Sequence, residues 1–175
     1  MASEAPLEPA DSGKVPVGDG WFVLNAAEAR WRAGQFGAYT RFEGETRFPG
    51  LGINIGVLEP GQASSMYHGE DDQEDLLVLA GECLLLIEGE ERRLRAWDFV
   101  HCPEWVEHVF VGAGEGPCTI LAVGARDGKG VVYPVSALAQ RHGAGVERET
   151  RDPQEAYAAS PEDVAVAFRA DWLPG

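Results

Sequence analysis

The chain has 175 residues, of which 45% are hydrophobic and 25% charged, so it can form one core and one domain with tails. Its formal net charge of −15 at pH 7 argues against nucleic acid, which requires a basic face, and against an anionic membrane surface. Its three cysteines show no CxxC spacing. We therefore expect no disulfide framework, and a reducing cytoplasm as the compartment.

The N-terminal residues 1–19 are rich in proline, alanine and acidic residues, which predicts a flexible tail. They lack the basic start and apolar run of a signal peptide. Residues 21–24 then predict a short strand. Residues 26–32 predict one or two helical turns, which Gly34 ends.

A succession of short strand-like runs extends from about residue 36 to residue 125. The runs cover residues 52–58, 74–81, 82–89, 92–102, 107–112 and 117–125. Turn residues separate them at roughly ten-residue spacing, which is typical of an antiparallel sandwich or barrel. Residues 88–91 (EGEE) predict a hairpin tip. We assign residues 20–130 to one β domain.

Three short helices are predicted in the remaining residues, 131–175. They cover residues 134–142, 153–159 and 161–172, the last with Ser160 as N-cap and acidic residues in its first turn. We expect this C-terminal extension to pack on the β domain or on a partner subunit. The last helix would have an apolar side, formed by Val164, Ala167 and Phe168.

Imidazole and carboxylate groups gather around two of the predicted strands. Glu74 opens a strand whose alternate residues are apolar, so its carboxylate would be costly there unless it is paired or binds a metal. His68 and Glu70 come shortly before it, and His108 begins a later strand. Imidazole with carboxylate is a ligand set for transition metals.

At His68, Glu74 and Gly81, and again at Pro103 and His108, the chain resembles the cupin superfamily. The resemblance covers about residues 50–126. It implies a mainly β fold, the double-stranded β-helix or jelly-roll barrel, followed here by the short C-terminal helices. It also implies a metal in the mouth of the barrel, held by two or three histidines and one glutamate. The resemblance further implies a homodimer, which the apolar side of the last predicted helix supports.

The chain departs from the cupin pattern in both motifs. If His68 is the first histidine of the usual pair, Glu70 stands in the place of the second; if it is the second, Met66 stands in the place of the first. The glycine positions of the second motif carry Trp97 and Trp105. These two side chains would either line the pocket or pack in the core or at the rim.

The resulting hypothesis is a divalent metal site made of His68, Glu74 and His108, with Glu70 or Gln73 as a further ligand. Zn, Fe, Mn and Ni all suit such ligands. The metal would act as a Lewis acid or template for a small polar metabolite. Whether the protein is an enzyme stays open, since the alternative is a non-catalytic cupin that binds or senses a small ligand, without metal if the site has been lost.

The remaining histidines and the cysteines have structural interpretations. We expect His101 to be a hydrogen-bonded core residue and His142 to lie at a helix end. Cys83, Cys102 and Cys118 are expected to be small core residues.

Overall fold

The structure is a computed structural model that describes residues 2–128 and 130–173. Met1, in the predicted tail, and residues 174–175, at the end of the predicted C-terminal extension, lie outside the described residues. In chain order its elements are β1 (Leu7–Pro9), β2 (Lys14–Pro16), the 3-10 helix η1 (Ala26–Glu28), β3 (Trp31–Gly34), β4 (Gly37–Arg41), β5 (Leu51–Leu58), β6 (Gly69–Glu70), β7 (Glu74–Ala80), β8 (Glu82–Ile87), β9 (Glu90–Arg95), β10 (Phe99–Cys102), β11 (His108–Ala113), β12 (Cys118–Ala125), β13 (Val131–Val132), α1 (Ala137–Arg141), α2 (Pro153–Ala156) and β14 (Val164–Ala165).

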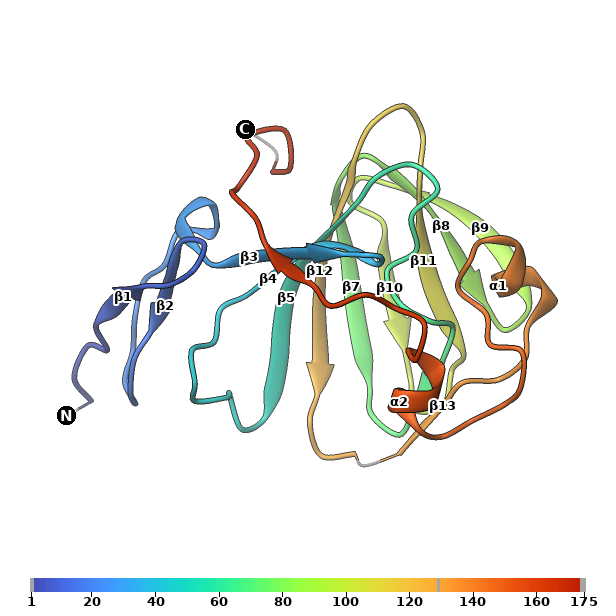
Figure 1. Cartoon of the computed structure of the whole chain (residues 1–175), viewed down its shortest axis with the longest axis horizontal. Coiled ribbons are helices and arrows are strands. Elements are labelled where there is room, and N and C mark those ends of the chain that lie inside the picture. Colours follow the sequence, from blue (N-terminus) through green and yellow to red (C-terminus); the bar gives the residue numbers. More distant parts are fainter. Residues whose placement is uncertain (1, 129, 174–175) are drawn as a thin grey trace.

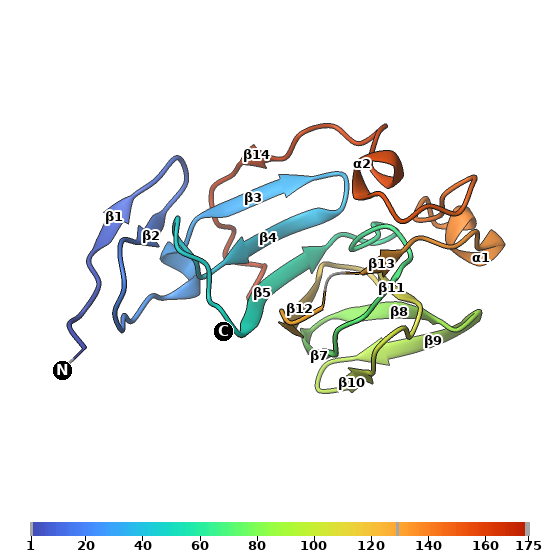
Figure 2. The ribbon, with the colours of Figure 1, turned by 90° about the horizontal axis from the view of Figure 1, so that it is seen from below.

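Two antiparallel sheets form the body of the protein (Figures 1 and 2). The larger has the strand order β10-β7-β12-β5-β4-β3-β14 and the smaller the order β11-β8-β9. Two-stranded ladders join β1 to β2 and β13 to β6. The mainly β jelly-roll fold is thus confirmed. No helix in the described part of the chain has both the length and the apolar character needed to cross a membrane.

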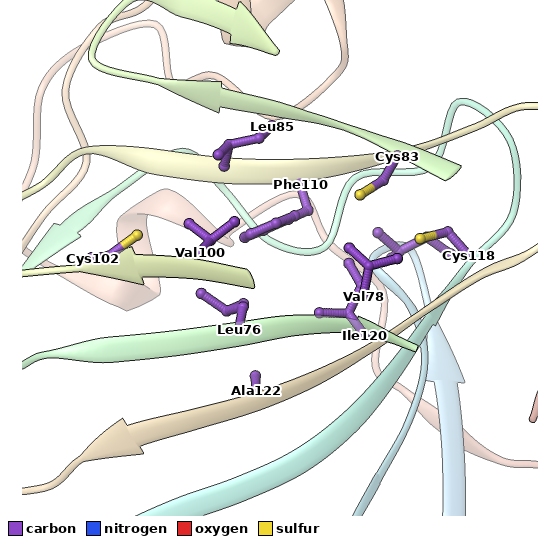
Figure 3. Packing of buried hydrophobic residues seen from close by; sticks show 11 residues of the cluster. Leu76, Val78, Cys83, Leu85, Val100, Cys102, Phe110, Cys118, Ile120 and Ala122 are labelled. Carbon is purple, nitrogen blue, oxygen red and sulfur yellow. The ribbon is translucent and has the colours of Figure 1, made fainter. Parts of the chain in front are cut away.

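The inward faces of the two sheets enclose the main core (Figure 3). Alternate residues of each strand point inward because the side-chain period of a strand is two. On β7 this places Leu76 and Val78 in the core behind Glu74, as the sequence predicts. Phe110 of β11 meets them from the smaller sheet and is only 2% exposed. All three cysteines are buried free thiols, as expected.

The jelly-roll barrel is open, because the two described sheets are not hydrogen-bonded into a closed ring. The chain passes from β9 in the smaller sheet to β10 in the larger through a turn at residues 96–98. Trp97 N–H donates to Val78 O, and Val78 N–H donates to Asp98 O. These hydrogen bonds join the turn to β7 and do not extend the β8–β9 ladder. The two sheets therefore face each other with open edges.

The two tryptophans at the cupin glycine positions keep the backbone conformation that glycine would favour. Trp97 has φ of 76° and Trp105 has φ of 64°, the left-handed region that a bulky residue rarely adopts. Trp97 is 72% exposed, and Trp105 carries the guanidinium of Arg151 at 5.6 Å from its ring centroid. Both side chains are thus at the surface.

The N-terminal region is more ordered than its composition predicts. Strands β1 and β2 form a hairpin within the predicted flexible tail, and Glu4 forms a parallel bridge with Trp21. The predicted strand at 21–24 is absent apart from this bridge, and the predicted helix at 26–32 is reduced to η1 before β3 begins. The domain boundaries at residues 20 and 131 stay a prediction.

The C-terminal predictions are partly confirmed. Ser136 caps α1 and Asp152 caps α2, so two short helices lie within the ranges expected. The predicted helix at 161–172 is wrong: the segment contains no helix, and its only regular element is β14, which pairs with β3 at the edge of the larger sheet. Tertiary pairing here outweighs local helix propensity.

Phe168 and Trp172 lie against Trp31, with ring centroids 6.0 and 5.0 Å apart. Phe168 therefore packs within its own chain and does not offer the apolar helix face on which the homodimer prediction depended. The homodimer stays a prediction.

Candidate metal centre

The two central histidines are brought together by main-chain pairing at the edge of the smaller sheet. The segment before β6 runs antiparallel beside β11, with bridges between Ala63 and Val111 and between His68 and His108. His68 N–H donates to His108 O at 3.2 Å, and His108 N–H donates to His68 O at 2.8 Å. The two imidazole centroids lie 5.3 Å apart.

Each imidazole is oriented by a carbonyl two residues before it. Nδ1 of His68 lies 2.8 Å from Met66 O, and Nδ1 of His108 lies 3.0 Å from Val106 O. A carbonyl oxygen only accepts, so each Nδ1 carries a proton. In each ring Nε2 is therefore the nitrogen that can bind a metal, as in metal-binding histidines.

Two glutamates complete the cluster. Ligand atoms of His68, Glu70 and Glu74 all lie within 4.8 Å of one another. Glu74, the first residue of β7, also places its Oε2 3.1 Å from Nε2 of His108. His68, Glu70 and Glu74 thus form one group of possible ligands, and His108 adjoins this group through Glu74. The role of these four residues as metal ligands stays a prediction.

The electrostatics of the cluster follow from burial and crowding. Burial and the neighbouring His108 lower the pKa of His68. Burial, followed by the Glu74 carboxylate, raises the pKa of Glu70 to about 7. For Glu74, burial favours the neutral form, but the hydrogen bond and charge of His108 outweigh it and hold the pKa below its ordinary value.

His108 shows the opposite balance. Burial disfavours its charged form, yet hydrogen bonds with Cys102 and Glu74 raise its pKa to about 10. Protonated His108 and ionised Glu74 therefore form an ion pair when no cation is bound.

The donor set fits a divalent transition metal. It offers two imidazole nitrogens with a fixed tautomer and two carboxylates, and hydrogen bonds from Nδ1 to carbonyls are the usual support for such ligands. Two carboxylates crowded in a partly buried site also repel each other, and a cation relieves this repulsion.

A cavity of about 580 Å³ opens onto the cluster. This volume is in the range of small-molecule sites. Its floor is the inward face of the larger sheet, and the C-terminal segment forms part of its rim. Its lining includes Tyr39, Arg41, Asn54, Leu58, Ser64, Ser65, His68, Glu74, Leu76, His108, Phe110, Ile120, Ala122, Tyr157, Glu162 and Asp163.

Several other sequence predictions can now be placed. Gln73, the other proposed ligand, is exposed and donates to Asp75 Oδ2 at 2.6 Å, so it does not join the cluster. His101 is not a core residue: it lies on the exposed face of β10 with Nδ1 2.6 Å from Asp75 Oδ1. The expectation failed because β10 alternates, and Val100 and Cys102 take its inward positions. His142 ends α1, as predicted.

Two aromatic residues next to the cluster were not expected from the sequence pattern. The ring centroid of Tyr133, just after β13, lies 5.9 Å from that of His68. Tyr157, at the end of α2, packs edge-on against the Tyr133 ring, with 5.8 Å between the two centroids. The Tyr157 hydroxyl accepts Met66 N–H at 3.1 Å. Arg41 and Asn54 were missed as well, because strand periodicity alone does not tell which face of a two-sided sheet borders a cavity.

Comparison with known proteins identifies the domain. Residues 54–124 match the family model for the cupin domain. A polyketide cyclase from Streptomyces resistomycificus is 13% identical over 62% of this chain and 82% of its own, with a TM-score of 0.55.

A structure described as a sugar phosphate isomerase of the cupin superfamily, from Silicibacter pomeroyi, is 21% identical over 87% of this chain and 99% of its own, with a TM-score of 0.56. At these identities the two structures show a shared fold alone. No curated protein sequence matches the chain. The chain therefore contains a cupin domain, which the family model matches over residues 54–124.

Proposed function

We propose that this cupin binds a divalent transition metal through His68, Glu74, His108 and Glu70, and uses it to act on a small polar molecule in the cavity. The observation that supports this most directly is that His68, Glu74 and His108 all line a cavity of about 580 Å³, and that ligand atoms of Glu70 lie close to those of His68 and Glu74. A structural metal is usually enclosed by protein ligands, whereas a catalytic one borders open space.

The protein residues have separable tasks in this proposal. Met66 O and Val106 O hold the two imidazoles in orientation. A bound metal would supply Lewis acidity to an oxygen atom of the substrate. The apolar floor of the cavity limits the access of water.

The first test is metal analysis of untagged protein. We expect stoichiometric metal in the wild type and loss of it in the double variant His68→Ala, His108→Ala. A matched control removes two histidines outside the cavity, His101→Ala with His142→Ala, and is expected to retain the metal. Equal metal content in both double variants, or none in the wild type, would contradict the proposal.

The second test separates an enzyme from a binding protein. The direct ion pair between His108 and Glu74 gives the cluster a satisfied state without metal, which is what the alternative, a metal-free ligand-binding cupin, requires. Metal-loaded protein should convert members of a panel of hydroxy acids and sugars. In one set of assays the protein is loaded with Fe(II) and oxygen uptake is measured. Ligand binding that is equal with and without metal, and with no turnover, would favour the alternative.

A further inference from the structure

The cavity has a second polar end, about three strands away from the metal cluster. On β4, Tyr39 and Arg41 line the cavity, while Thr40 between them is buried and does not line it. On β5, the Cα partner of Arg41 is Asn54, which also lines the cavity. Arg41 and Asn54 therefore stand side by side on the cavity floor.

Within the described residues, neither side chain has a hydrogen-bond or ion-pair partner, and Arg41 is exposed. No hydrogen bond or ion pair engages the Arg41 guanidinium or the Asn54 amide there; the guanidinium lies only over the ring of Tyr39, at 5.2 Å from its centroid. This is notable in a chain with 29 acidic residues and 14 basic ones. An unpaired guanidinium beside an unpaired amide offers several donors to one oxyanion.

The nearby carboxylates are engaged elsewhere or exposed at the rim. Glu43 forms a two-pronged ion pair with Arg126 at 2.5 and 3.0 Å. Asp163 Oδ2 accepts the Tyr39 hydroxyl at 3.0 Å. Glu162 lines the rim and is exposed. The fold thus leaves Arg41 to a group that enters the cavity.

The intervening floor sets the shape of such a ligand. Strands β4, β5, β12 and β7 are neighbours in that order, so roughly 14 Å of sheet separates the backbone of Arg41 from that of β7, at about 4.8 Å per strand. Ala122 and Leu76 occupy the positions between Asn54 and the cluster. A ligand that contacts both ends is elongated, with a metal-binding group at one end and a charged group at the other.

We propose that Arg41 and Asn54 form an anion subsite, so that the substrate of this cupin is an elongated oxygenated molecule whose far end is a carboxylate or a phosphate. This inference rests on the proposed function for the end of the ligand that meets the metal. The planar guanidinium suits both anions. The overall charge of −15 repels anions, so a preference for them would require local donors of this kind.

Three probes that share one carbon chain separate the possibilities. Gluconate has a neutral far end, glucarate has a carboxylate there, and 6-phosphogluconate has a phosphate. Calorimetric titration of metal-loaded, full-length protein should show glucarate or 6-phosphogluconate binding at least roughly ten-fold more tightly than gluconate. Which of the two binds more tightly identifies the anion.

The variant Arg41→Met keeps the apolar stem and should abolish this preference without changing gluconate affinity or metal content. Arg47→Met makes the same charge change at an exposed residue that does not line the cavity, and should keep the preference. Equal binding of all three probes by the wild type, an unchanged preference in Arg41→Met, or an equal loss in both variants would overturn the inference.

The metal content of each sample keeps the two proposals distinguishable. A wild type that holds metal but shows no preference refutes the anion subsite and leaves the metal site standing. A wild type without metal refutes the proposed function, while an Arg41-dependent preference for 6-phosphogluconate would still support the subsite.

Discussion

Replacing Glu43 by glutamine tests whether its ion pair with Arg126 holds the loop between β4 and β5 against the end of β12. The Glu43 side chain is 6% exposed and accepts two hydrogen bonds from Arg126 and one from Phe48 N–H, at 2.7 Å. Arg126 also donates to Phe48 O at 2.8 Å. The ion pair therefore closes the loop as well as neutralising a buried carboxylate.

The expected cost follows from the bonds that are lost. Glutamine has one acceptor oxygen where glutamate has two, so the variant loses the charge pairing and at least one charge-assisted hydrogen bond, each such bond being worth about 1.5–3 kcal/mol. It also leaves the Arg126 charge, 26% exposed, without its partner. We expect the free energy of unfolding to fall by about 2–4 kcal/mol at pH 7.

The pH dependence has a defined sign. Burial alone would raise the pKa of Glu43, but the hydrogen bonds from Arg126 and Phe48 hold it below its ordinary value of 4.5. A lowered folded-state pKa stabilises the fold fully above pH 4.5 and loses this contribution as the pH falls through the folded-state value. The difference between wild type and Glu43→Gln should therefore shrink below pH 4.5.

Urea unfolding followed by tryptophan fluorescence, at pH 7 and at several values below 4.5, measures both effects. Glu45→Gln removes an exposed carboxylate from the same loop and serves as the control, with little expected change. A wild-type stability for Glu43→Gln at pH 7, or a difference that persists unchanged in acid, would refute this account of the ion pair.

Three further substitutions test the packing. Phe110→Ala, in the core between the sheets, should lower the free energy of unfolding by about 3–5 kcal/mol in urea; a loss below 1 kcal/mol would contradict its central place. Trp172→Ala should cost about 3 kcal/mol and expose residues 160–173 to limited proteolysis, because Trp172 is buried against Trp31 and its carbonyl accepts the Thr119 hydroxyl; Val164→Ala, at an exposed position, should do neither. Trp97→Gly should change the free energy of unfolding, measured by thermal melting, by no more than about 1 kcal/mol. Glycine relieves the strain of the positive φ, and this gain offsets the greater entropy of the unfolded chain and the small loss of packing. A loss beyond about 3 kcal/mol would show that the exposed indole stabilises the turn.

The candidate site was predictable from the sequence to an uneven degree. His68, Glu74 and His108 could be found because each stands at a strand start or in a short segment with a recognisable spacing. Glu70 was found as the residue in the place of the absent histidine, and it does join His68 and Glu74. Gln73 could not be separated from it in sequence, because a loop leaves the direction of each side chain open.

The order of the strands and the number of sheets also could not be predicted from the sequence pattern. Alternation along β5, β7 and β12 predicts strands with two faces, but both faces of the larger sheet are largely apolar and only three-dimensional pairing tells them apart. One face meets the smaller sheet and the cavity, and the other meets Trp31 and the C-terminal segment. For this reason Arg41 and Asn54 could not be recognised as cavity residues.

What the sequence alone determined is the mainly β, jelly-roll character of the chain and the identity of four clustered polar residues, because side-chain period, turn residues and motif spacing are local properties. Only the tertiary structure decided that the sheets stay open, that residues 161–172 form no helix, and that Arg41 and Asn54 line the same cavity as His68, Glu74 and His108. These features depend on pairing between segments far apart in the chain, such as β14 with β3 and the bridge between His68 and His108. Local propensity cannot express such long-range pairing, which is settled by the burial and hydrogen bonding of the whole fold.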